Sequence, residues 1–192
     1  YQGDSAITIQ GGANTARTYA CNAICDVQGG QMTVARIYGE LQASTLLSVA
    51  VYLGELSNAS GTQLVAYGRT TIGTATAGTK IHMVRLEDMT PSPNPNIPDA
   101  WTPEAGTPIV VVIEVFSPST QPNNSNILGS STSGDASGLF GLNLAFLRGG
   151  SVSAFTAQNI VAGTPIEDLD GYNGRSTTQL RVCHHFDPFT PV

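Results

Sequence analysis

Apolar and polar residues alternate along most of the chain with the two-residue period of a β-strand, and runs of Gly, Pro, Asn and Ser separate the alternating segments. No interval carries a sustained helical stripe of apolar residues. The pattern predicts strands over residues 5–10, 17–22, 31–41, 46–54, 63–71, 79–87, 107–116, 139–147, 151–155 and 177–186. We therefore expect an all-β fold: a single jelly-roll-like antiparallel β-sandwich with long Pro-rich and Ser/Asn-rich loops.

The segment 107–116 departs from this alternation because both of its faces are apolar. Its odd-numbered positions from 109 to 115 are Ile or Val, and its even-numbered positions include two valines and Glu114. A strand in a two-layer sandwich needs one buried face, so the second face needs a separate cover. Two long irregular stretches, 90–106 and 117–138, flank the strand as predicted surface loops. We expect one of them, carrying Trp101 or Ile97, to fold over that second face.

The composition predicts a surface with few charges. The 192 residues fit one domain, and 41% of them are hydrophobic, but only 11% are charged, which is less than half the usual share. Neutral polar residues must therefore coat the molecule. A surface with so little charge favours association with copies of itself or with a matrix. A secreted protein with a Ser/Thr/Asn-rich surface is the alternative.

The net charge argues against one class of partner, and the length of the apolar runs argues against another. The net charge is -6 and no basic cluster occurs, so we expect no nucleic acid as a partner. The longest apolar runs are far shorter than the roughly 20 residues that span a bilayer, so we expect no membrane insertion. The chain begins with Tyr1 rather than Met, which fits removal of a leader or a longer gene product.

The N-terminal segment, residues 1–24, is set apart from a β-sandwich domain over residues 25–192. It has few apolar residues at its start, where Ala6, Ile7 and Ile9 offer a short strand. Such a strand is able to pair with an exposed sheet edge of another subunit. The alternative is an ordinary first strand within its own sheet.

Three cysteines, Cys21, Cys25 and Cys183, allow one disulfide with one cysteine left over. A turn after Cys21 would bring it within reach of Cys25, whereas an extended chain would hold the two thiols too far apart. The competing bridge joins one of them to Cys183. A zinc site made with His184 and His185 lacks the usual paired spacing.

No arrangement of residues points to catalysis, so we expect no enzyme and no catalytic residues. The chain contains no GxSxG motif. Glu114 would need a second carboxylate facing it to act as a general acid in glycoside hydrolysis, and no partner can be assigned. The alternative for Glu114 is an outward-facing carboxylate that accepts hydrogen bonds from Ser or Thr.

One loop and one aromatic residue are candidates for binding. Asp168, Asp170 and Asn173 resemble the start of a calcium loop, but the bidentate Glu is missing, and a solvated Asp-Gly turn is the alternative. We therefore expect no cofactor, with calcium kept as a candidate. Trp101 is a candidate for stacking on a sugar ring of a polysaccharide; the alternative is that it plugs one end of the sandwich.

The stretches ARIYGEL, LLSVAVYLGEL, SGTQLVAYGRTTIG and EAGTPIVVVIEVF, with RSTTQLRV near the end, resemble the secreted jelly-roll modules of bacterial surface proteins. The resemblance implies a non-catalytic role in adhesion, glycan binding or surface assembly. Viral jelly-roll coat proteins share this architecture.

Together these observations predict a non-enzymatic extracellular structural subunit that self-assembles into a filament, sheath or surface layer. A viral capsid or decoration protein, located in the virion, and a carbohydrate-binding module are the alternatives.

Overall fold

The computed structural model describes residues 5–8, 15–24, 32–90, 95, 101–102, 104–117, 125–129, 140–172 and 176–188. Within them, antiparallel strands dominate, accompanied by short 3-10 helices. The strands are β1 Ser5–Thr8, β2 Thr15–Ile24, β3 Met32–Leu41, β4 Leu46–Leu53, β5 Gln63–Thr71, β6 Gly78–Arg85, β7 Glu87–Asp88, β8 Pro108–Ser117, β9 Asn126–Gly129, β10 Phe140–Gly150 and β11 Ser176–Pro188. The helices are η1 Leu56–Gly61, η2 Thr74–Thr76 and η3 Ile166–Asp168. The predicted all-β class is confirmed.

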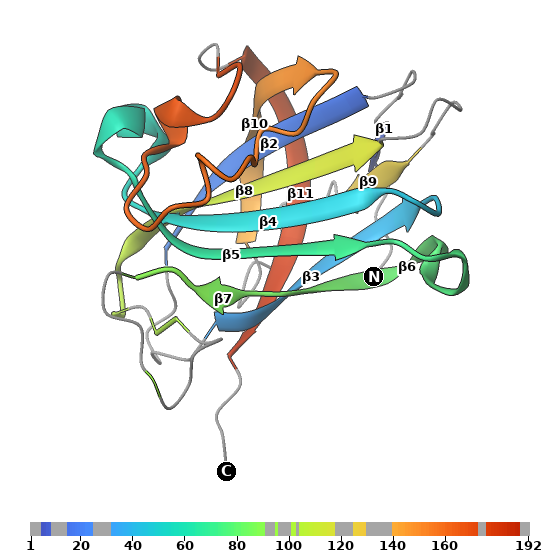
Figure 1. Cartoon of the computed structure of the whole chain (residues 1–192), viewed down its shortest axis with the longest axis horizontal. Coiled ribbons are helices and arrows are strands. Elements are labelled where there is room, and N and C mark those ends of the chain that lie inside the picture. The colour runs from blue at the N-terminus through green and yellow to red at the C-terminus, as the bar shows by residue number, and fades with distance from the viewer. Residues whose placement is uncertain are drawn as a thin grey trace.

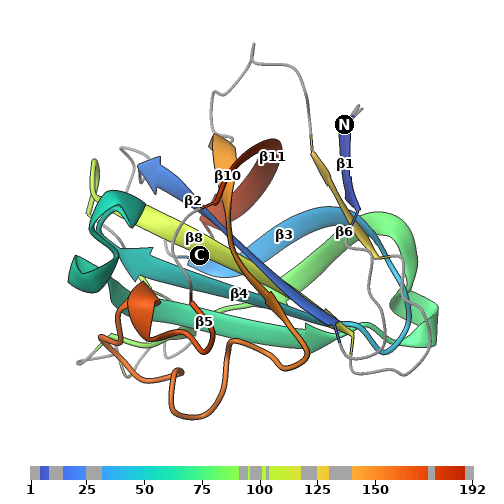
Figure 2. The same ribbon diagram turned by 90° about the horizontal axis from the view of Figure 1, so that it is seen from above.

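The strands form one continuous sheet that is folded into two layers (Figures 1 and 2). Its order is β1-β9-β3-β11-β10-β2-β8-β4-β5-β7, and β6 pairs with the other edge of β3. We call β10, β2, β8, β4, β5 and β7 the front sheet and β6, β3, β9 and β1 the back sheet. β11 pairs with both β10 and β3, and thereby joins the two layers. The result is an antiparallel β-sandwich.

The main core lies between the two sheets, and alternation along the strands builds it as predicted. The inward row of β4 is Leu47, Val49 and Val51, each fully buried, with Leu53 at its partly buried end. The odd-numbered residues of β8 face the same core, because β8 pairs with β4 along its length. The back sheet contributes Ala35 and Ile37.

A close approach of backbones at Gly68 closes one side of the sandwich. The chain leaves the back sheet after β6 and joins the front sheet as β7, which pairs with β5. At this corner the backbone of Arg85 crosses β5 so closely that a Cβ added to Gly68 would lie 1.9 Å from the Arg85 carbonyl oxygen. Only glycine fits here.

Three strand predictions need correction. Residues 151–155 form bends and irregular backbone instead of a strand. The predicted strand 79–87 is divided, because Leu86 lies between β6 and β7 and its N–H donates to the Thr33 carbonyl at 2.8 Å. β9 is an additional strand within the stretch 117–138, which we expected to be loop throughout.

The described strands of the N-terminal segment, β1 and β2, belong to the same sheet as the rest of the chain. β2 lies between β8 and β10 and pairs with β8 over ten residues, so the proposed boundary after Ile24 does not divide the sheet. β1 pairs with β9 of its own chain, with Ala6 opposite Leu128 and Ile7 opposite Ile127. Ile9 lies outside the described residues.

Candidate functional site

The outer face of the front sheet carries a second hydrophobic core. Residues 151–172, which we call the cover segment, cross this face (Figure 1) and bury Ala154, Phe155, Ile166 and Leu169 against it. From the sheet, this core takes the even-numbered valines of β8 together with residues of β2, β4, β5 and β10. The second face of β8 is therefore sheltered by its own chain. The expectation that 90–106 or 117–138 supplies this cover is wrong, since another segment does.

A buried carboxylate connects the cover segment to the sheet. Glu114 of β8 is fully buried. The hydroxyl of Thr18 donates to its Oε2 at 3.1 Å, and the backbone N–H of Ala154 donates to the same oxygen at 2.6 Å. The hydroxyl of Ser153 donates to Oε1. Glu114 thus accepts from Ser and Thr as predicted, but it is covered by the chain instead of facing solvent.

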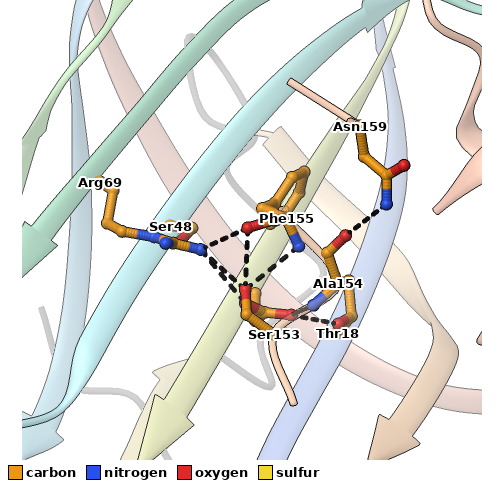
Figure 3. Close-up of polar contacts among 8 residues, drawn as sticks. Thr18, Ser48, Arg69, Ser153, Ala154, Phe155 and Asn159 are labelled. Carbon is orange, nitrogen blue, oxygen red and sulfur yellow. Dashed lines mark hydrogen bonds and ion pairs between the residues drawn. The ribbon is translucent and has the colours of Figure 1, made fainter. Parts of the chain in front are cut away.

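Arg69 of β5 completes this Glu114 cluster from the partly exposed side (Figure 3). Its Nη2 lies 3.9 Å from Glu114 Oε1 and donates to the Ser153 hydroxyl at 2.7 Å and to the Phe155 carbonyl at 3.0 Å. Its Nε donates to the Ser48 hydroxyl of β4 at 2.9 Å. One guanidinium therefore holds two strands and the cover segment in a fixed arrangement.

A hydrogen bond within the cover segment holds its backbone, since the side-chain amide of Asn159 donates to the Ala154 carbonyl at 2.9 Å (Figure 3). At its far end, the Thr62 hydroxyl accepts from the Ile166 N–H at 2.8 Å. The backbones of Leu64 and Thr164 also pair, at 3.0 Å. The cover segment is thus attached to the sheet at both ends.

The chemistry of the Glu114 cluster is that of a fixed ion pair. Among the described residues, each group that contacts the carboxylate oxygens is a donor, and none is a second carboxylate. A general acid needs access to its substrate, and a fully buried Glu114 lacks it. The geometry favours a structural role over the general-acid hypothesis.

Neighbouring tyrosines are neutral phenols at physiological pH. Burial raises the pKa of Tyr52 well above its usual value of 10, and the nearby Tyr67 raises it further. Burial also raises the pKa of Tyr67, whose ring packs against Phe155 with centroids 5.2 Å apart. Both rings belong to the second core.

The residues of the candidate calcium loop are only partly described. Asp168 and Asp170 lie at the end of the cover segment with exposed side chains, and Asn173 lies outside the described residues. In the part of the chain that the structure describes, no group of three His, Cys, Asp or Glu side chains is close enough to hold a metal ion. The calcium site stays a prediction.

Trp101 is in the main core. Only 6% of its surface is exposed, and its backbone carbonyl accepts from the Met32 N–H at 2.7 Å. An indole in this position offers no open ring face to a sugar. This burial corrects the glycan-contact hypothesis in favour of the alternative, a plug in the sandwich.

The strand order bears on the cysteines. Cys21 lies in β2 and Cys183 in β11, and β10 runs between these strands. Two strands separated by a third lie about 9.6 Å apart, whereas a disulfide requires Cα atoms closer than about 7 Å. The fold therefore excludes a Cys21–Cys183 bridge. β2 stays extended as far as Ile24, and Cys25 lies outside the described residues.

Sequence reasoning missed Arg69, Ser153 and Asn159 as partners of the buried carboxylate region. Ser153 is 39 positions from Glu114 in the chain, and no spacing rule links them. The available indication was a carboxylate in an apolar strand, which must find donors if it is buried.

No family model, curated protein or solved structure matches the chain. Within the described residues, no helix has the length and apolar character that a membrane span requires.

Proposed function

We propose that this chain is a non-enzymatic extracellular structural subunit that assembles with copies of itself into a filament, sheath or surface layer. The observation that carries the proposal is the character of the surface. Only 11% of the residues are charged. Exposed large hydrophobic side chains nevertheless occur within the described residues: Met83 at 64% and Ile81 at 51% on β6, and Val152 at 57% and Val161 at 51% on the cover segment. Little charge repulsion opposes contact between copies, and these side chains gain from burial.

The two-faced strand β8 does not add to this proposal, because the cover segment already buries its second face. A self-contained fold of this kind fits a subunit that is stable before it assembles. The N-terminal β1 is a candidate for exchange between copies, since it is the terminal strand of the sheet and pairs only with β9 within the described strands.

Electron microscopy of the purified protein over rising concentration tests the proposal. We expect regular filaments or lattices whose repeat is a copy of this chain. Closed icosahedral particles would instead favour a capsid or decoration protein. Monomers that sediment with insoluble polysaccharide would favour a carbohydrate-binding module, and either result would overturn the proposal.

A further inference from the structure

β6 is an edge strand of the back sheet in the part of the chain that the structure describes. One side of β6 pairs with β3 along its whole length and without a register shift. No described strand pairs with the other side over residues 79–83. Beyond this stretch β5 closes that side, since Gly68 lies against the Arg85 carbonyl oxygen. We call residues 79–83 the free edge.

The hydrogen bonds to β3 determine which backbone groups point to the free edge. Leu86 follows the last pair of the β3–β6 register, and its N–H donates to the Thr33 carbonyl at 2.8 Å. In an antiparallel pair, residues that exchange hydrogen bonds with the neighbour alternate with residues whose N–H and C=O point to the other side. The even-numbered residues of β6 therefore bond to β3. The N–H and C=O groups of the odd-numbered residues point to the free edge.

The free edge is apolar on its outer face. Ile81 is 51% exposed and Met83 is 64% exposed, whereas His82 between them is buried on the inward side. The stretch contains no Pro and no bulge, two of the devices that keep sheet edges from pairing. Its one charged residue, Lys80, lies on the inward side, and its Nζ donates to the Ala75 carbonyl at 3.4 Å. Backbone groups that no described strand pairs thus lie beside exposed apolar side chains.

We propose that the free edge pairs with the free edge of a second copy, antiparallel, around a two-fold axis beside Ile81. Centring the contact on Ile81 keeps the paired stretch within residues 79–83 and leaves the Gly68 corner of each copy outside it. Ile81 then lies opposite the partner's Ile81, and Met83 lies opposite the partner's Thr79. Each of these pairs exchanges two N–H···O=C bonds, because both members point to the seam. This inference rests on the proposed self-assembly and names one contact that carries it.

A second copy matches this edge in both backbone and side chains. A two-fold contact uses the same surface of both subunits, so each donor of one edge meets an acceptor of the same edge in the partner. On the outer face, Ile81 and Met83 of both copies come together in one patch. Each copy therefore covers exposed apolar side chains of the other.

The charges beside this patch are arranged with unlike signs across the seam. Within one copy, Glu40 of β3 lies opposite Thr79, and Arg36 lies opposite Met83. One row of the joined sheet therefore runs from Glu40 to the partner's Arg36. These residues are three strand spacings apart, about 14 Å, so their attraction contributes to orientation more than to affinity.

The contact is expected to be weak. It covers only residues 79–83, far fewer than the roughly 20 to 30 residues a side of a standard stable interface. Lys80 also lies diagonally across the seam from the partner's Lys80 on the inward side, where the two like charges repel. On its own the two-fold contact closes a dimer, so growth into a filament needs a second contact elsewhere on the subunit.

Ile81→Lys tests the contact by sedimentation velocity over a rising concentration series. The substitution places two ammonium groups opposite each other at the centre of the seam and removes the apolar pair. The dissociation constant of the dimer should rise by about tenfold or more. Val161→Lys is the matched control, since Val161 on the cover segment has the same exposed fraction, 51%, and this variant should assemble as the wild type does. Circular dichroism checks that both variants remain folded.

Cysteine substitutions test the register and do not depend on the folding of Ile81→Lys. The Cα atoms of Ile81 and the partner's Ile81 are expected about 5.5 Å apart, within disulfide range. Ile81→Cys should therefore form a linked dimer of twice the 20.0 kDa mass under mild oxidation. Thr79→Cys and Met83→Cys should each fail to link to itself, because equivalent residues lie about 14 Å apart, but a mixture of the two should link. The wild type, oxidised in the same way, gives the background from the native cysteines.

The outcomes separate this contact from the proposed function. Wild-type assembly that Ile81→Lys retains in full, or an Ile81→Cys protein no more linked than the assembling wild type, overturns the β6 contact and leaves self-assembly standing. A wild type that stops at a dimer, which Ile81→Lys abolishes, supports the contact and overturns the filament. A wild type that stays monomeric at every concentration overturns both.

Discussion

Glu114 holds a charge inside the protein because donors from separate segments converge on it. Thr18 comes from β2, Ser153 and the Ala154 N–H come from the cover segment, and Arg69 comes from β5. A buried carboxylate without such partners would be strongly destabilising. The same side chain therefore fastens the cover segment and makes its position specific.

Replacing Glu114 by Gln tests this role. In Gln, an NH2 group, which is a donor, replaces one of the two carboxylate oxygens that accept hydrogen bonds. Buried donors then lose their acceptor, and we expect a loss of about 2 to 4 kcal/mol in the free energy of unfolding. Urea denaturation measures it. Glu104→Gln, at an exposed loop position, is the matched control and should change stability by less than about 0.5 kcal/mol. Equal stability of the two variants would contradict the fastening role.

His82 makes stability depend on pH. Its Nε2 lies 3.1 Å from the Gly39 carbonyl oxygen and 3.2 Å from that of Gly78, and burial lowers its pKa below the usual 6.5, an effect that these two hydrogen bonds partly oppose. As the pH falls through about 6.5, the unfolded chain takes up a proton that the folded chain resists. The contribution of His82 is thus complete above that pH and declines below it.

We expect the wild type to lose stability relative to His82→Gln between pH 7 and pH 5. Urea unfolding of both proteins at several pH values gives the difference, in which the titration of all other groups cancels. Stability curves that run parallel over this range would show that the folded protein binds the proton as readily as the unfolded chain does.

Gly68→Ala tests the close approach where β6 and β7 meet β5. The new methyl group would overlap the Arg85 carbonyl, so the corner must shift, and we expect a loss of about 1 to 3 kcal/mol. Gly73→Ala is the control, because its Cβ would lie 3.6 Å from the nearest atom, the Thr76 hydroxyl oxygen, at a φ of -80°. Thermal unfolding of both variants measures their loss of stability. A Gly68→Ala protein as stable as Gly73→Ala would contradict the corner geometry.

The cover segment explains what β8 does with two apolar faces. Its odd-numbered residues pack in the main core, and its even-numbered residues pack beneath Phe155, Ile166 and Leu169. β4 behaves in the same way, since Ala50 and Tyr52 are buried on its outer face. The front sheet is therefore a central layer, with the back sheet on one side and the cover segment on the other.

Phe155→Ala should loosen the cover segment. Phe155 is 2% exposed and packs on Tyr67, and such truncations cost about 3 to 5 kcal/mol. We expect faster exchange of the backbone amide hydrogens of residues 151–172 and of β4. Val161→Ala, at an exposed position of the same segment, should leave exchange unchanged. Unaltered exchange in Phe155→Ala would show that the segment is held without this ring.

Strands were predictable from sequence where alternation and turn residues agree, as in β4 and β5. The contacts of the cover segment were not, because Ser153 and Phe155 lack a period that marks their partners, and the partners lie far away in the chain. Val152 and Ala154 alternate with serines, as apolar residues do in a strand, and so predicted one. In the structure, the hydrogen bonds of Ser153 and Ala154 to Glu114 hold the backbone in bends. β9 was hidden because its four residues lie in a Ser/Asn/Gly-rich stretch.

At the scale of the whole molecule, the expectation of assembly rests on the surface. Unsatisfied strand faces give no reason for it in the described centre of the front sheet, since both faces of β4 and β8 are buried within one chain. That surface has few charges and carries the exposed Ile81 and Met83 on β6 and the exposed Val152 and Val161 on the cover segment. Such a surface favours weak, repeated contacts between stable subunits over an obligate interface.

Sedimentation velocity of the wild-type protein over a hundredfold range of concentration tests self-assembly. We predict a 20.0 kDa species at the lowest concentration and a growing distribution of larger species at the highest. A single sharp monomer boundary at every concentration would contradict the account.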